Sequence, residues 1–260
     1  MHAIGLSRGL FAVASAGLAI LHLAYGDYAP IPDWMPWRET WSYGSALLVL
    51  IASAGLCCSR IARPSALTIA AYLALWALTS VPQIVLKPLS VDGWYGFCEA
   101  LTSLVGAWIL YARSPGQSRG SQSPIVSARA VGVARILFGL SCVFYGWSHF
   151  VYPAYTAGMV PGWLPGHLRL AQFTGLAHIA AGVGIIVGIW PRLAATLEAT
   201  MMSLFGLLVW LPSFFTSPRP AWAMPPQNQW SELVVSLLLA ASAWIVAASL
   251  TPARPAAPSE

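Results

Sequence analysis

Three histidines and three glutamates stand within or beside long apolar stretches of this sequence, and their side chains are the ones best suited to acid–base chemistry. They are His22, Glu99, His149, His178, Glu198 and Glu232. An imidazole titrates near neutral pH, so a histidine beside a carboxylate can relay a proton or bind a polar group of a ligand. An ionisable side chain near the centre of a bilayer costs several kcal/mol, which makes each such residue a functional candidate.

The depth of these residues along their predicted helices separates them into two groups. At the standard helical rise, His178 lies roughly 15 Å from the outer end of its helix and Glu198 roughly 9 Å from the inner end of the next one. His149 and Glu232 are expected nearer the outer surface. We therefore predict a ligand or proton site in the second half of the chain, open to the outer face and lined by His149, His178 and Glu232, with Glu198 below.

The first half offers only His22 and Glu99 as equivalents of His149 and Glu232. A structural alternative stays open for all six residues, namely polar groups that are satisfied by neighbouring helices. On the ligand hypothesis, replacing His178 with leucine is expected to be tolerated for folding, because an apolar side chain is readily accommodated between membrane helices.

The elements that must position these residues are membrane helices. The chain of 260 residues is 58% hydrophobic and 8% charged, whereas soluble domains carry about 25% charged residues. Eight apolar blocks have about the length that crosses a bilayer, at 4–25, 41–58, 64–87, 94–112, 130–152, 168–190, 193–215 and 229–250. Helices satisfy their own backbone in lipid, so we predict an all-α integral membrane protein with eight transmembrane helices and the lipid bilayer as its surroundings.

Basic residues predict the orientation of these helices. One side carries Arg8, Arg60, Arg63, Arg113, Arg119, Arg129, Arg135, Arg192 and Arg254, and the other carries Arg38, Lys87, Arg169 and Arg219. The richer side is expected to be cytoplasmic. This places both termini in the cytoplasm and the protein in the cell (inner) membrane. Because the basic residues are scattered singly, no nucleic-acid partner is predicted.

The chain also resembles itself at a shift of 127 residues. The coincident pairs are Arg8/Arg135, Leu10/Leu137, Phe11/Phe138, His22/His149, Tyr25/Tyr152 and Tyr28/Tyr155. We predict two four-helix units in a parallel repeat, at 1–113 and 128–250. A polar Gly/Ser/Pro linker at 114–127 is expected to join them, and 251–260 is expected to be a disordered cytoplasmic tail.

Several motifs in the second half resemble the DoxX-like family of four-helix membrane proteins. They are Gly146-Trp-Ser-His-Phe-Val-Tyr-Pro153, Met159-Val-Pro-Gly-Trp-Leu-Pro165, Thr174-Gly-Leu-Ala-His178 and Pro191-Arg-Leu-Ala-Ala195. The resemblance reaches the degenerate first unit through the repeat, and it departs at His178, where a glutamate is expected. It implies a small membrane protein, in some members a subunit associated with thiosulfate or quinol redox chemistry.

Three classes of function follow. The first is a redox- or quinone-associated membrane subunit with a redox partner protein, the second is a small-molecule or proton-coupled transporter or binding protein, and the third is a structural accessory protein without catalysis. A self-contained enzyme is disfavoured, because the sequence shows no phosphate-binding glycine loop, HExxH or zinc-ligand spacing. No metal site is predicted. Quinone is the candidate cofactor, and haem held by His22 and His149 is disfavoured.

Overall fold

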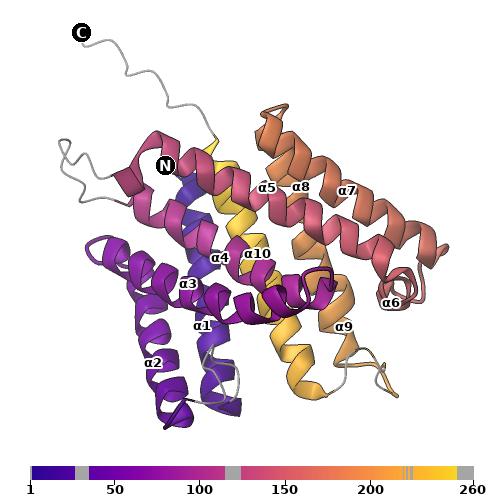
Figure 1. Ribbon diagram of the computed structural model, residues 1–260, viewed down its shortest axis with the longest axis horizontal. Helices are drawn as coiled ribbons and strands as arrows, with labels where there is room; N and C mark the ends of the chain where they lie inside the picture. The colour runs from indigo at the N-terminus through magenta and orange to yellow at the C-terminus, as the bar shows by residue number, and fades with distance from the viewer. Residues whose placement is uncertain are drawn as a thin grey trace.

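The computed structural model describes residues 2–26, 35–114, 124–218, 220, 222 and 225–250, and all regular structure within them is helical (Figure 1). The long helices are α1 (His2–Tyr25), α2 (Arg38–Leu56), α3 (Ala62–Leu86), α4 (Val91–Arg113), α5 (Ala128–Val151), α7 (His167–Val187), α8 (Pro191–Phe205) and α10 (Pro226–Ser249). Shorter elements are the 3-10 turn η1 (Pro124–Val126), α6 (Pro153–Met159), the π-helical turn η2 (Gly206–Trp210) and α9 (Leu211–Ser213). The predicted all-α class is confirmed for the described residues.

Six of the described helical segments are long and apolar enough to cross a membrane. They are Gly5–Tyr25, Ala62–Leu86, Ala128–Val151, His167–Val187, Pro191–Ser213 and Pro226–Ser249. The segment Pro191–Ser213 joins α8, η2 and α9 into one continuous helix. The helices α2 and α4 fall outside this set, and both carry charge: Arg38 and Glu39 begin α2, while Asp92, Glu99 and Arg113 lie in α4. The predicted count of eight transmembrane helices is therefore not confirmed.

The surface of the bundle supports the membrane assignment. Large apolar side chains are exposed on several of the helices, among them Leu6 on α1, Leu78 on α3, Phe173 on α7 and Leu197 on α8. A water-soluble monomer rarely exposes apolar surface on this scale. The protein is thus a multi-pass helical bundle of the membrane type.

Proline and glycine set the ends of the helices in the second half. Pro191 and Pro226 begin α8 and α10. Proline is tolerated there because an N–H group in the first turn of a helix has no hydrogen-bond acceptor within the helix. Gly188 ends α7 with a φ of 77°, a left-handed conformation that glycine adopts without steric cost. The Ser127 hydroxyl accepts a hydrogen bond from the Ala130 N–H (3.1 Å) and caps α5. The sharp turn between α7 and α8 makes these two helices an antiparallel pair.

Neighbouring helices pack in chain order within each half, but the first helix of each half finds a further partner in the other half. Thus α1 packs on α2 and also on α10, while α5 packs on α7 and also on α4. The last helices of the halves, α4 and α10, contact each other. Neither half is consequently a closed four-helix bundle on its own.

The helices α1 and α10 run in opposite directions. A Cβ at Gly106 of α4 would meet both Phe11 and Ser242, and a Cβ at Gly17 would meet Val234 (3.3 Å), so residue numbers rise along α1 as they fall along α10. The start of α1 and the end of α10 therefore lie at the same end of the bundle (Figure 1). Which end faces the cytoplasm stays a prediction.

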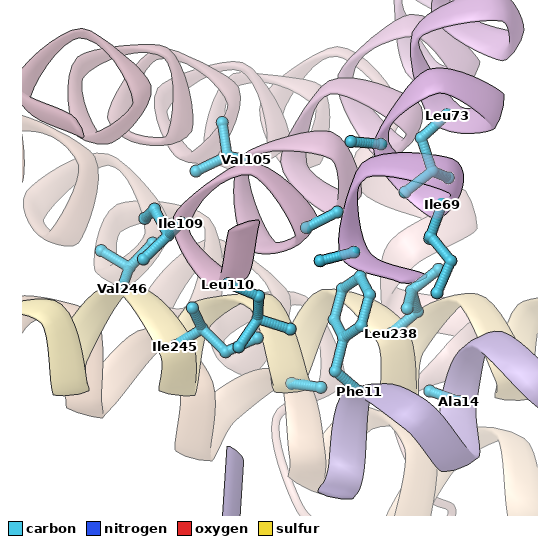
Figure 2. Packing of buried hydrophobic residues seen from close by; sticks show 14 of the residues in the cluster. Phe11, Ala14, Ile69, Leu73, Val105, Ile109, Leu110, Leu238, Ile245 and Val246 are labelled. Atoms are coloured by element: carbon cyan, nitrogen blue, oxygen red, sulfur yellow. The ribbon is translucent and has the colours of Figure 1, made fainter. Parts of the chain in front are cut away.

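One apolar core joins the two halves. Its largest fully buried side chains include Phe11 on α1, Ile69 on α3, Leu110 on α4 and Leu238 on α10. Figure 2 shows them gathered around the crossing of α4, α10 and α1. Most of the predicted linker, 115–123, and the predicted tail, 251–260, lie outside the described residues.

An arginine pair fixes the end of α10, and removing one member should weaken the bundle. The Arg135 guanidinium donates to the carbonyl and hydroxyl oxygens of Ser249, and Arg113 Nη2 donates to the same carbonyl (3.4 Å). Cations stabilise the free carbonyls at a helix C-terminus. We expect Arg135→Gln to lower the free energy of unfolding by about 1–2 kcal/mol, measured by SDS-induced unfolding in mixed micelles.

Arg129→Gln is the matched control, since Arg129 lies on the same helix α5 and is exposed. Its effect should stay within about 0.5 kcal/mol. Equal losses in the two variants would mean that the contacts to Ser249 do not stabilise the end of α10.

Candidate functional site

The α5–α7 crossing brings His149 and His178 together. Gly146 and Gly175 face each other across it, and a Cβ at Gly175 would lie 2.8 Å from the Cβ of His149. Small residues at such a crossing let two backbones approach closely. As a result, the imidazole rings of His149 and His178 lie with their centroids 5.5 Å apart, inclined at 63°.

The centre of the site is a hydrogen bond between His178 and Glu198. The two residues lie on α7 and α8, and the His178 Nδ1 to Glu198 Oε1 distance is 2.8 Å. Both side chains are 1% exposed. We place the hydrogen on Nδ1, because a carboxylate oxygen can only accept a hydrogen bond. His178 Nδ1–H then donates to Glu198 Oε1.

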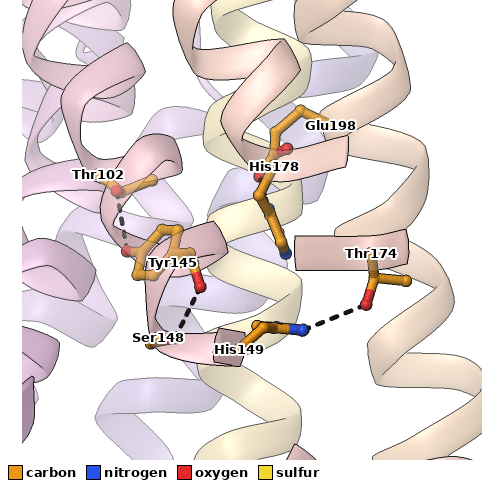
Figure 3. A network of polar contacts seen from close by, with 7 residues as sticks. All are labelled: Thr102, Tyr145, Ser148, His149, Thr174, His178 and Glu198. Atoms are coloured by element: carbon orange, nitrogen blue, oxygen red, sulfur yellow. Dashed lines mark hydrogen bonds and ion pairs between the residues drawn. The ribbon is translucent and has the colours of Figure 1, made fainter. Parts of the chain in front are cut away.

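Each partner keeps one buried polar atom without a hydrogen bond. These atoms are His178 Nε2 and Glu198 Oε2. An unpaired buried polar group costs about 1–3 kcal/mol, so natural proteins rarely retain one without a reason. In Figure 3 the far end of the His178 ring points toward His149, while Glu198 approaches from the opposite side.

His149 continues the polar chain toward the end of α5. Its Nδ1 lies 2.9 Å from the Ala171 carbonyl oxygen and 3.2 Å from the Thr174 hydroxyl. The Phe205 ring lies against both histidines, with centroid distances of 6.4 Å to His149 and 5.7 Å to His178. Glu198, His178, His149 and Thr174 thus form one polar file between three helices.

Tyr145 of α5 lies beside the polar file formed by Glu198, His178, His149 and Thr174. Its ring lies 6.1 Å from that of His178, and its hydroxyl is 3.0 Å from that of Thr102 on α4. The sequence interpretation missed Tyr145, Thr174 and Phe205. Tyr145 and His149 are four residues apart and therefore lie on one face of their helix. This spacing could have predicted that Tyr145 lies beside the site.

The predicted place of Glu232 beside His178 stays a prediction, because the described contacts of Glu232 are with other groups. It lies on α10, close enough to Glu99 of α4 for the two carboxyl groups to interact electrostatically, and Tyr95 lies within the field of both. The described contacts of His149 and His178 involve α5, α7 and α8 instead. The structure therefore brings His149, His178 and Glu198 together and places Glu99 with Glu232.

His22 lies in a third environment. It is 1% exposed on α1, and its Nδ1 is 3.0 Å from the Tyr72 hydroxyl of α3. Gln229, which the sequence interpretation did not single out, is fully buried on α10. Its amide nitrogen donates to the Ser213 carbonyl and hydroxyl oxygens (3.2 Å each), while its Oε1 has no partner.

A groove of about 420 Å³ lies between α7 and α8 and includes Glu198 in its wall. Small residues of α7 (Ala177, Ala181 and Gly184) line one side, and Leu193, Leu197 and Met201 of α8 line the other. The groove reaches the α7–α8 turn at Trp190, in the half of the bundle predicted to be cytoplasmic. The predicted opening toward the outer face stays a prediction.

The residues that the structure describes contain no group of three or more His, Cys, Asp or Glu side chains placed to hold one metal ion. Four free thiols are present, with Cys57 and Cys58 exposed at the end of α2 and Cys98 and Cys142 buried. Cys142 on α5 lies close enough to Glu198 to interact with its carboxyl group. The site is thus built from acid–base side chains and one thiol.

The fold and the site define a multi-pass, all-helical protein of the membrane type with a buried His–Glu pair. In comparisons with known proteins, residues 138–247 are similar to a family described as Domain of unknown function (DUF8561). The match covers less than half of the chain and includes His149, His178, Glu198 and Glu232. Neither the comparison with curated proteins nor the comparison with solved structures gives a match.

Proposed function

We propose that this protein is a redox-associated membrane subunit that exchanges protons with a lipid-soluble carrier of the quinone type. The observation that carries this proposal is the buried His178–Glu198 pair, in which each partner keeps one polar atom without a hydrogen bond. Unpaired polar atoms are uncommon in buried pairs that serve stability alone. With the proton on Nδ1, the unpaired Nε2 and the unpaired carboxylate oxygen both accept hydrogen bonds, so they match a ligand with hydroxyl donors, as in a quinol.

The residues fit such a carrier by the chemistry of their donors. Reduction of a quinone to a quinol takes up two electrons, which a redox partner protein would supply, and two protons at the ring oxygens. In the reverse direction a quinol gives up two protons, which Glu198 Oε2 and His178 Nε2 can accept, and the rings of Tyr145 and Phe205 exclude water around them. A dry surrounding strengthens every electrostatic interaction within the site.

The polar file also supplies a path for the protons. Glu198 hydrogen-bonds His178, the His178 ring faces His149, and His149 contacts Thr174 on the next turn of α7. Histidine can accept a proton on one ring nitrogen and release one from the other. No hydrogen bond joins the His178 and His149 rings among the described contacts, so in this proposal a ligand oxygen at His178 Nε2 completes the path toward the end of α5.

Infrared difference spectroscopy tests this proposal directly. The protein in lipid nanodiscs would be loaded with a benzoquinone or a naphthoquinone and cycled between oxidised and reduced states. We expect a carboxyl C=O band that changes with quinone reduction and disappears in Glu198→Gln. Thr200→Val, an exposed change on the same helix α8, is the matched control and should keep the band. Spectra that are identical in wild type and Glu198→Gln would overturn the proposal.

A proton-coupled binding protein or transporter is the second candidate, and the groove beside Glu198 favours it. A carboxyl group that is alternately protonated and ionised at a ligand site is a recurring device of such proteins. Proteoliposomes with a pH gradient distinguish the two candidates. Transport predicts ligand-dependent proton flux without an electron donor, whereas a redox subunit needs one.

The architecture supports a finer proposal in which the protein spans the membrane eight times as two parallel four-helix units. Each half packs its helices in the same order. In both halves the first helix also packs on the last helix of the other half, α1 on α10 and α5 on α4. The DoxX-like resemblance belongs to this proposal, with both termini cytoplasmic. Reporter fusions at residue 120 and at the C-terminus test it, since a periplasmic signal from either one contradicts the topology.

A further inference from the structure

The groove between α7 and α8 has Glu198 in its wall and lies on the side of the bundle. Both helices belong to segments long and apolar enough to cross a membrane. Leu193 and Leu197 on its rim are 52% and 58% exposed, so the mouth faces the hydrocarbon in the predicted arrangement. A ligand that dissolves in lipid can therefore enter the groove beside Glu198 without crossing water.

The size and the walls of the groove limit what it can hold. Its volume of about 420 Å³ lies within the range of roughly 300–1,000 Å³ usual for small-molecule sites. The small alanine and glycine residues of α7 line one side of the groove, and the leucine and methionine side chains of α8 line the other. The body of the ligand must therefore be apolar.

Glu198 determines the polar group of the ligand. It is 1% exposed, it forms part of the groove, and its Oε2 lacks a partner. A carboxylate oxygen accepts hydrogen bonds, so the matching group is a donor. A cationic amine would lose its hydration in an apolar groove at a large cost, whereas a neutral hydroxyl loses much less.

A residue at the mouth has an unusual backbone conformation. Trp190 has a φ of 45°, which is a genuine outlier for a bulky side chain, and strain of this kind often occurs at ligand sites. Its side chain is 77% exposed and lines the groove. The indole is thus held beside the opening, where it can contact a flat ligand.

We infer that the α7–α8 groove binds a membrane-soluble molecule with an apolar body and a hydroxyl group that donates a hydrogen bond to Glu198. The inference rests on the proposed function in using the same pair, but it concerns binding alone and needs no electron transfer. The hydroxyl could belong to a phenol or quinol ring or to an aliphatic lipid alcohol. The test distinguishes these two sources.

Binding of two matched probes to the full-length protein in nanodiscs tests the inference. The probes are 1-naphthol and 1-methoxynaphthalene, which share a ring system but differ in the donor hydrogen. We expect 1-naphthol to bind at least about tenfold more tightly, as fits the loss of one hydrogen bond to a charged group. Glu198→Gln should reduce that preference. Equal affinity of the wild type for both probes would overturn the inference.

Filling the groove gives a second test that leaves the His–Glu pair in place. Ala177→Phe on α7 should abolish binding of 1-naphthol. Ala74→Phe is the matched control, because Ala74 lines a separate apolar groove between α3 and α4, and it should leave the affinity unchanged. Unchanged binding in Ala177→Phe would contradict the assignment to this groove.

Competition with 1-dodecanol identifies the source of the hydroxyl. Displacement of 1-naphthol by dodecanol at similar concentration indicates an aliphatic lipid alcohol, and retention of the naphthol indicates an aromatic ring. Either result supports the inference. Selective binding without the infrared carboxyl signal would retain the groove site and reject the redox role.

Discussion

Replacing His178 with leucine is expected to lower the free energy of unfolding by about 3–5 kcal/mol, because it leaves the Glu198 carboxyl group buried without its partner. The hydrogen bond of 2.8 Å joins the two side chains directly, and both residues are 1% exposed. SDS-induced unfolding in mixed micelles, followed by far-ultraviolet circular dichroism, measures the loss. This outcome differs from the tolerance expected from the sequence, in which His178 had no assigned partner.

The double variant His178→Leu/Glu198→Leu is the control for this prediction. With both polar groups removed, no orphaned atom remains, so we expect most of the lost stability to return. A double variant less stable than His178→Leu alone would show that repacking, rather than the unpaired carboxyl group, causes the loss. Wild-type stability in the single variant would mean that the pair contributes nothing to folding.

The second large effect is expected at the α5–α7 crossing. Gly146→Ala should lower the free energy of unfolding by about 1–3 kcal/mol, because the new Cβ would collide with the Gly175 carbonyl oxygen and lie 2.9 Å from the Ile179 nitrogen. Both contacts are with backbone, which cannot rotate away. The same separation of helices would move His149 away from His178, so binding at the site should weaken as well.

Gly132→Ala on the same helix provides a control of opposite sign. A Cβ at Gly132 has nothing within 4 Å, and alanine is favoured over glycine within a helix by about 0.5–1 kcal/mol. We therefore expect a small gain in stability, read from the same unfolding curves. A loss in Gly132→Ala comparable to that in Gly146→Ala would indicate a general intolerance of α5 to substitution.

The helices were predictable from the sequence because each lies on an apolar block bounded by proline, glycine or charge. The short helix α6 was missed, since Pro153–Met159 is too short to form such a block. The predicted blocks at α2 and α4 fall on helices, but these two helices are not among the six that are long and apolar enough to cross a membrane by length and composition. Length and apolar content thus predict a helix better than they predict a span.

The candidate site was predictable in part. Depth along the helix singled out His178 and Glu198, but periodicity gives no pairing between helices, so their hydrogen bond could not be foreseen. Glu232 was placed with them on the assumption that the second half forms a closed bundle. In the structure α10 also packs on α4 and α1, and Glu232 interacts with Glu99, so its place beside His178 stays a prediction.

The pairing of α1 with α10 has a consequence for how the chain is made. During synthesis the first helix enters the membrane long before the last one. The face of α1 around Phe11 therefore has no packing partner until Leu238 and its neighbours on α10 have been synthesised. Until then, lipid or an insertion factor has to cover that face. Chains that stop before α10 should therefore be recognised by quality-control proteases as unfinished, although most of their helices are already in place.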